Sequence, residues 1–295
     1  SPAAGMILQT RNEGSVENYG IEATLGQDII KTKDFDWTAT ANFSLNRGRV
    51  KSLPDQIVQI DGTNYGGIYP TAFLGGSSTG ITGKDYLRNE NGDVICDENG
   101  YPLIDTSKQL YIGNREPDFL LGLGSNFRYK ELTASFLFDG RCGGDVVNIT
   151  GSSLISNGQH HLYDKYRNRE VVFNGVVKNA DGTYSPNTTP IILDQTTVNK
   201  YFYPVSSNFI EDGSYIRLSY VTVGYDMSKL LSKNSPVKGL NVSLTGRNLF
   251  LLTKYSGSDP QVQESGSANG SGTGGFDRYN VPNTRSFNLS LKATF

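Results

Sequence analysis

Residues 35–46 have the sequence FDWTATANFSLN, in which apolar and polar side chains alternate at every position. Successive side chains of an extended strand point to opposite faces, so this pattern predicts a strand with one apolar and one polar face. The apolar face would carry Phe35, Trp37, Ala39, Ala41, Phe43 and Leu45. A soluble β-sandwich contains such strands too, so the rest of the chain has to decide the class of protein.

The same alternation recurs along the chain, and the predicted strands cover residues 16–25, 35–46, 118–129, 132–140, 214–226, 240–252 and 286–295. A polar turn over residues 27–34 would join the first two strands into a hairpin. The alternation changes phase near Ser219 and Tyr220, which predicts a β-bulge. Gly (34 residues) and Tyr (17 residues) are frequent, as in turn-rich structure, so we expect an all-β protein.

The connections between these strands alternate between short and very long. The long ones cover residues 47–117, 141–213 and 253–285, and short turns lie between them. A compact soluble domain seldom contains one structureless connection of that length. Transmembrane barrels combine short periplasmic turns with long extracellular loops, so the pattern predicts a transmembrane antiparallel β-barrel. Since an odd set of seven strands cannot close in lipid, we expect residues 1–295 to be part of a larger barrel.

The composition excludes some partners. A net charge of −2 and a pI near 5.8 leave no basic footprint for nucleic acid. No apolar run reaches the roughly 18 residues of a membrane-spanning helix. Cys96 and Cys142 match no metal-binding pattern, and two unpaired thiols are favoured over a disulfide.

Several motifs resemble those of the SusC/RagA-type TonB-dependent outer-membrane transporters. They are FIEDGSYIRL at 209–218 with VTVGY at 221–225, GRNLF at 246–250, TKYSGSDP at 253–260, and YIGNREPDF at 111–119. The block from 209 to 260 is the most specific part of this resemblance. In the last motif a proline more often follows the asparagine, where this chain has Arg115.

The resemblance implies a barrel of about 22 strands, of which this chain would supply about the last seven. The N-terminal plug and the segment that contacts TonB would lie outside this chain. Members of the family import oligosaccharides or peptides across the outer membrane of Gram-negative bacteria, together with a SusD-like surface lipoprotein. The barrel-insertion machinery reads the family's terminal aromatic residue, which Phe295 matches. Phe287, Leu289, Leu291 and Phe295 would thus belong to a lipid-facing terminal strand.

The long connections carry the candidate ligand contacts. Sugars stack on aromatic rings and peptides dock beside them, although most such tyrosines pack loops against each other. The candidates for contact with substrate or with the lipoprotein are Tyr65, Tyr69, Tyr163, Tyr166, Tyr201 and Tyr203. Asn91, Asp93 and Asp97 could offer oxygen atoms to a metal ion, but a small hairpin with Asn-Gly turns is favoured over a metal site.

An enzyme is weakly supported. His160 and His161 are the only histidines, and we expect them to diverge in a solvated loop rather than to serve catalysis or a metal. No nucleophile motif is present, and no cofactor is expected. The main alternative to a transporter is a non-transporting surface protein, an adhesin that displays the long loops.

Overall fold

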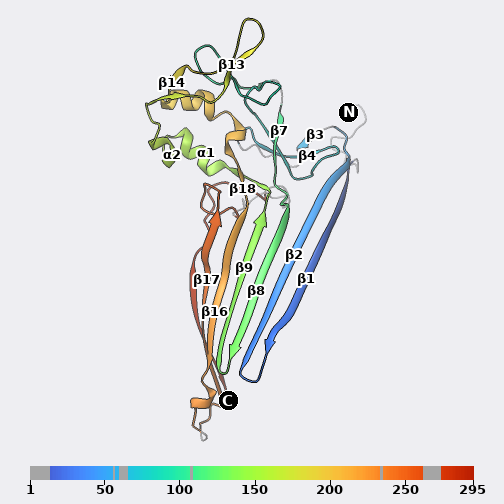
Figure 1. Cartoon of the computed structure of the whole chain (residues 1–295), viewed down its shortest axis with the longest axis vertical. Helices are drawn as coiled ribbons and strands as arrows, with labels where there is room; N and C mark the ends of the chain where they lie inside the picture. The colour runs from blue at the N-terminus through green and yellow to red at the C-terminus, as the bar shows by residue number, and fades with distance from the viewer. Residues whose placement is uncertain (1–13, 56, 60–65, 107–108, 233–234, 262–273) are drawn as a thin grey trace, which may run out of the picture.

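The computed structural model describes residues 14–55, 57–59, 66–106, 109–232, 235–261 and 274–295. Long strands form one antiparallel sheet in which spatial order follows chain order, β1-β2-β8-β9-β16-β17-β19. Their bounds are β1 (Ser15–Lys31), β2 (Phe35–Ser52), β8 (Phe119–Tyr129), β9 (Leu132–Cys142), β16 (Tyr215–Asp226), β17 (Gly239–Thr253) and β19 (Ser286–Thr294). Every strand predicted from the alternation is therefore confirmed, and Figure 1 shows them as one tall sheet.

The register places the apolar side chains of neighbouring strands side by side on one face. Leu121 pairs with Phe43 on one side and with Gly140 on the other, and Leu244 pairs with Leu289. Nothing in the described part of the chain covers this face at β19, where Leu289 is 76% exposed. The opposite face carries the polar side chains of the alternation, such as Asn42. The sheet thus has the two-faced surface of a barrel wall.

The predicted turn at residues 27–34 is too long. β1 continues to Lys31 and stays paired with β2, with a register shift between Asp28 and Ile30. The shift accommodates an extra residue, and a turn of only three residues, 32–34, follows. The β8–β9 turn is tighter still, with Lys130 at a φ of 53°.

The predicted bulge is confirmed. The pairing of β16 with both its neighbours shifts between Leu218 and Tyr220. On the facing strand β17, Asn248 adopts a φ of 52°, and its Nδ2 donates to the carbonyl of Thr284. Asn tolerates this left-handed conformation better than most residues, which gives the GRNLF motif a structural reason.

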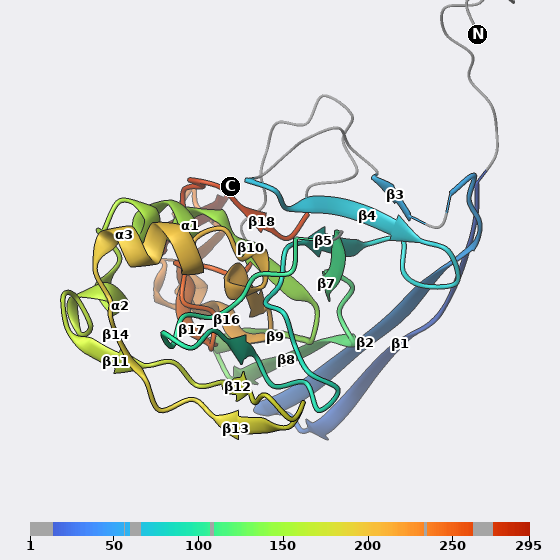
Figure 2. The same cartoon turned by 90° about the horizontal axis from the view of Figure 1, so that it is seen from above.

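The described parts of the three long connections are folded rather than structureless, and together they form what we call the crown (Figures 1 and 2). The first contains β3 (Ile57–Gln59), β4 (Tyr69–Phe73), β5 (Gly80–Gly83), β6 (Ile95–Cys96) and β7 (Leu110–Asn114). The second contains β10 (Asp145–Asn148), α1 (Ile149–Ser156), α2 (His161–Asp164), β11 (Glu170–Val172), β12 (Val176–Lys178), β13 (Tyr184–Pro186), β14 (Pro190–Ile192), α3 (Gln195–Thr197), η2 (Val198–Phe202), η3 (Ser206–Phe209) and β15 (Ile210–Asp212). The third contains β18 (Phe276–Asp277).

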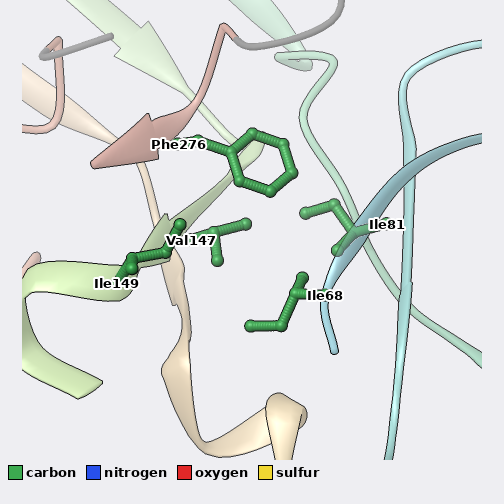
Figure 3. Packing of buried hydrophobic residues seen from close by; sticks show 5 residues of the cluster. All are labelled: Ile68, Ile81, Val147, Ile149 and Phe276. Atoms are coloured by element: carbon green, nitrogen blue, oxygen red, sulfur yellow. The ribbon is translucent and has the colours of Figure 1, made fainter. Parts of the chain in front are cut away.

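The hydrophobic core lies in the crown. Figure 3 shows Ile68 and Ile81 of the first connection packed with Val147 and Ile149 of the second and Phe276 of the third. Short sheets join the same segments, because β10 pairs with β18 and β12 pairs with β6. Among the described residues, no helix is long and apolar enough to cross a membrane. The crown is therefore one packed unit that draws on all three connections.

Candidate functional site at the crown

The YIGNREPDF motif lies where the first connection returns to the sheet. Arg47 at the crown end of β2 donates to the carbonyl of Pro117 at 2.7 Å, and Glu116 accepts a hydrogen bond from the backbone of Gly48 at 2.8 Å. Arg115 is 8% exposed, and its guanidinium lies 5.4 Å from the centre of the Phe276 ring. These contacts fix the orientation of the crown on the sheet.

The FIEDGSYIRL and TKYSGSDP motifs meet each other beside β10. Glu211 accepts hydrogen bonds from the backbone N–H of Ser256 at 2.6 Å and from Asn148 Nδ2 at 2.8 Å. Tyr255 donates its hydroxyl proton to Asp277 at 2.6 Å, and burial raises the pKa of this tyrosine. Both motifs therefore join segments of the second and third connections to each other.

A buried ion pair attaches the third connection to the polar face of the sheet. Arg217 of β16 contacts Asp259 at 2.6 Å, and their side chains are 5% and 4% exposed. The carboxylate of Asp259 also accepts hydrogen bonds from Gln261 N and Asn283 Nδ2, both at 2.9 Å. The sequence pattern gave no signal for this pair, because Arg217 and Asp259 are 42 positions apart.

The two histidines line a cavity of about 460 Å³ between α1 and the third connection. The expectation that the two side chains diverge in solvent is wrong for His160, which is 6% exposed and whose ring lies 4.6 Å from that of His161, whereas His161 is exposed as expected. The chain turns into α2 at His161, so extended-chain geometry does not apply. Burial, and then the nearby charge of His161, lower the pKa of His160.

Other groups around this cavity are amides, hydroxyls and a carboxylate. The side-chain amide nitrogen of Asn280, Nδ2, is buried and has no hydrogen-bond partner among the described residues. Asp277 is 3% exposed, and its oxygens accept hydrogen bonds from Thr150 and Tyr255. The carboxylate of Asp277 is thus already hydrogen-bonded within the protein. The groups of the cavity that remain open to a ligand are neutral. Asn280 has no sequence motif around it that could have singled it out.

The predicted tyrosines spread over the crown. Tyr201 stacks on Tyr101 with ring centres 4.4 Å apart, and Tyr203 lies edge-on to Phe209. Tyr166 and Tyr203 are 38% and 40% exposed. Tyr69 is half-buried in β4, Tyr163 belongs to α2, and Tyr65 lies outside the described residues.

The oxygen-rich segment forms turns. Asn89 accepts hydrogen bonds from the backbone of Asn91 and Asp93, and Asp97 accepts hydrogen bonds from Asn99 and Tyr101. Within the part of the chain that the structure describes, no group of three or more His, Cys, Asp or Glu residues could hold a metal ion. Cys96 and Cys142 are both free, and Cys96 is buried.

The terminal strand lies against β17. Phe287, Leu289 and Leu291 are 70%, 76% and 68% exposed on the apolar face, and Phe295 follows the strand at 83% exposure. No strand among the described residues covers the outer edge of β19 or that of β1. These side chains and backbone groups are therefore available to lipid and to further strands.

Comparisons with known proteins support this architecture. No protein-family model matches the chain. The TonB-dependent receptors P3 and P26 of Formosa agariphila are 27% and 29% identical to it over 99% of its length, which is 30% of theirs. The TonB-dependent receptor SusC of Bacteroides thetaiotaomicron is 26% identical over 97% of the chain and 27% of its own length.

The solved structure of the RagAB peptide importer in its open-open state has the same fold, with a TM-score of 0.70 and 19% identity over all of this chain and 30% of the solved one. Its closed-closed state gives a TM-score of 0.65. The chain thus spans about a third of the length of the proteins it matches. The relatives are receptors and importers rather than enzymes, in agreement with the expectation from the sequence. The chain is therefore similar in sequence to TonB-dependent receptors, SusC among them, and its seven-stranded sheet with the folded connections has the fold of about a third of the RagAB importer.

Proposed function

We propose that this chain is the C-terminal part of a receptor that imports oligosaccharides or peptides across the outer membrane of a Gram-negative bacterium. The observation that carries the proposal is a barrel wall with one apolar face, joined to a crown that packs as one unit. The apolar face would meet lipid and the polar face would line the lumen. The similarity to TonB-dependent receptors over 99% of the chain supports the same conclusion.

The crown would form part of the substrate entrance. Its cavity beside His160 offers neutral donors and acceptors, and cavities of this size admit small polar ligands. Tyr65, Tyr69, Tyr163, Tyr166, Tyr201 and Tyr203 remain the proposed contacts for substrate or for a partner. A SusD-like lipoprotein is the proposed partner, and it would close over the crown. The plug and the TonB contact would come from the rest of the receptor.

Deletion of the gene for the whole receptor tests the import function. We expect the cells to lose uptake of one class of fluorescent oligosaccharide or peptide, and a plasmid copy should restore it. A strain without TonB should show the same defect. Normal uptake of every class in the deletion strain would contradict the proposal. Loss of adhesion alone would favour the adhesin.

Two exposed tyrosines allow the contact proposal to be tested separately. We expect Tyr166→Ala and Tyr203→Ala to weaken binding of the imported substrate or of the lipoprotein, since each side chain is over a third exposed. Tyr184→Ala is a matched control, because Tyr184 is 39% exposed on β13 of the same connection and was not a candidate. If all three variants and the unaltered receptor bind with equal affinity, Tyr166 and Tyr203 do not contact the substrate or the lipoprotein.

A further inference from the structure

The cavity beside His160 lies where the second and third connections meet. Thr150 and Leu154 of α1 line it from the second connection, together with the two histidines. Ser258 and Asn280 line it from the third connection. Its volume of about 460 Å³ is within the range of ~300–1,000 Å³ in which proteins hold small ligands. The cavity is therefore large enough for a ligand that both connections contact.

One polar group of the cavity differs from its neighbours. Asn148 Nδ2 donates to Glu211 at 2.8 Å, and Asp277 accepts a hydrogen bond from Thr150 at 3.2 Å. The Nδ2 of Asn280 is buried as well, but no acceptor for it lies among the described residues. A buried donor without an acceptor destabilises a protein and calls for an explanation. A ligand that brings an oxygen acceptor would supply one.

The residue before Asn280 is held in a strained backbone conformation. Tyr279 has a φ of 55°, which a bulky side chain seldom adopts. Its backbone N–H donates to Thr150 Oγ1 at 2.7 Å, and its hydroxyl donates to Ser153 Oγ at 2.6 Å. Tyr279 is thus tied to α1 by its backbone and by the tip of its side chain, which keeps the adjacent Asn280 at the cavity. Strain that neighbouring bonds hold in place is frequent at ligand sites.

Polar and apolar groups alternate around the cavity. Burial lowers the pKa of His160, so its imidazole is neutral at pH 7. Ser258 and His161 are exposed and offer a hydroxyl and a second imidazole. Leu154 brings an apolar side chain that is 37% exposed. A sugar ring has the matching surface, because C–H groups cover its faces and hydroxyls project from its edge.

We propose that this cavity binds an uncharged sugar unit of the imported substrate, so that the receptor takes a neutral oligosaccharide rather than a peptide. Asn280 Nδ2 donates to an oxygen of the sugar, Ser258 bonds to one of its hydroxyls, and Leu154 contacts a C–H face. A peptide brings charged ends, but the carboxylate of Asp277 is already hydrogen-bonded within the protein. A sugar acid would meet the repulsion of the same carboxylate. The inference rests on the proposed import function and narrows its substrate class.

Isothermal titration calorimetry of the whole receptor tests this substrate class. The detergent must lack a sugar headgroup, because a maltoside would compete for the cavity. The titrants are neutral oligosaccharides of glucose, galactose, mannose and xylose, an oligogalacturonate, and a mixture of unblocked peptides. We expect at least one neutral oligosaccharide to bind and the oligogalacturonate and the peptides not to bind. Binding of the peptides or the oligogalacturonate in place of every neutral oligosaccharide would overturn the proposal, and so would an absence of binding across the whole set.

Variants locate the binding to the cavity. Asn280→Leu keeps the size of the side chain but removes the N–H, and it should weaken the affinity by about threefold to tenfold. Leu154→Trp fills the space beside α1 and should abolish binding. Asn99→Leu is the control, because Asn99 is an exposed turn residue of the first connection, and its affinity should be unchanged. Since Leu154 is partly exposed, Leu154→Trp decides the outcome even if Asn280→Leu does not fold. Unaltered affinity in both cavity variants would overturn the proposal.

Uptake by the deletion strain separates this inference from the proposed function. If deletion of the receptor abolishes uptake of peptides and leaves that of oligosaccharides intact, the import function stands and the sugar site fails. If uptake of neither class changes, the proposed function fails first. If oligosaccharide uptake is lost, a plasmid copy with Asn99→Leu should restore it fully, and a copy with Leu154→Trp should not. Full restoration by Leu154→Trp would contradict the sugar site alone.

Discussion

At the scale of single residues, several hydrogen bonds receive the buried charge of the Asp259 carboxylate. Arg217 and Asp259 illustrate this, since the carboxylate accepts bonds from Gln261 and Asn283 as well as from the guanidinium. Removing one partner of a buried pair leaves an uncompensated charge, which costs far more than the net worth of the pair. The SDP segment of the third connection is thereby held on the polar face of the sheet.

Asp259→Ala should therefore lower the free energy of unfolding of the crown and its sheet by about 3–5 kcal/mol. The measurement is thermal unfolding of the whole receptor in detergent. The loss of the heat-modifiable band on a gel reports the unfolded fraction at each temperature. Glu17→Ala is the control, because Glu17 pairs with Lys51 at 2.6 Å but both side chains are about half exposed. The control should melt as the unaltered receptor does. Equal melting of Asp259→Ala would show that the pair contributes no net stability.

His160 gives the crown a dependence on pH. Burial, followed by the charge of His161, lowers the pKa of His160 below its ordinary 6.5, although Glu211 opposes this shift. The unfolded segment then binds more protons than the folded one, so stability is complete above pH 6.5 and is lost as the pH falls toward the lowered pKa. Acidification should thus loosen the contacts of α1 and α2.

Hydrogen–deuterium exchange of residues 149–164 between pH 7.5 and about 5.5, corrected for the intrinsic exchange rate, checks this expectation. Exchange should accelerate at the lower pH in the unaltered receptor and much less in His160→Gln. His161→Gln should fall between the two, since it removes only the second cause of the shift. A uniform response of all three proteins would exclude His160 as the titrating group.

At the scale of elements, the alternation of apolar and polar residues predicted the long strands, because each of these strands has one apolar and one polar face. The short crown strands gave no such signal, because β5 is buried at every position and β4 at its three central positions. Consecutive Ile29 and Ile30 broke the alternation at the end of β1, where the pairing shifts. The bulge was predictable, since a bulge leaves the same phase change in the sequence. The contact between Arg217 of β16 and Asp259 of the third connection has no local sequence pattern, because the two residues are far apart in the chain.

The two faces of β19 should respond differently to one substitution. Leu291→Arg places a charge on the proposed lipid face, which costs about 2–4 kcal/mol near the bilayer midplane and less toward its surfaces. Ser290→Arg, one position away, directs the same side chain to the polar face and should be tolerated. Urea unfolding of the whole receptor in liposomes measures both. Equal destabilisation would mean that the apolar face does not contact lipid.

The bulge in β17 depends on a residue that accepts the left-handed conformation. Asn248→Val should destabilise the receptor by about 1–2 kcal/mol, because a β-branched side chain is strained at a φ of 52°. Asn248→Gly relieves the backbone but loses the hydrogen bond to Thr284, so its effect should be smaller. The same urea titration ranks the two variants. A more stable Asn248→Val receptor would mean that the bulge relaxes to a regular register at no cost.

At the scale of the whole molecule, the crown and the sheet differ in what stabilises them. The crown buries Phe276 completely among side chains from all three connections, so it has a core of its own. The sheet has none, and along the described residues β1 and β19 each pair on one side only. Unpaired strand edges cannot remain in hydrocarbon, because each free backbone group there costs several kcal/mol. The sheet therefore requires further strands, whereas the crown does not.

From this difference we predict the oligomeric state of residues 1–295 when they are expressed alone and purified in detergent. The crown should keep its packing, and the edges of β1 and β19 should associate with other copies, which yields polydisperse oligomers. The whole receptor should migrate as a heat-modifiable monomer in the same detergent. Multi-angle light scattering separates the two cases, and near-ultraviolet circular dichroism reports the packed tyrosines of the crown. A monodisperse, soluble monomer of residues 1–295 that unfolds cooperatively would refute the barrel wall, since such a protein would have no need of lipid or of additional strands.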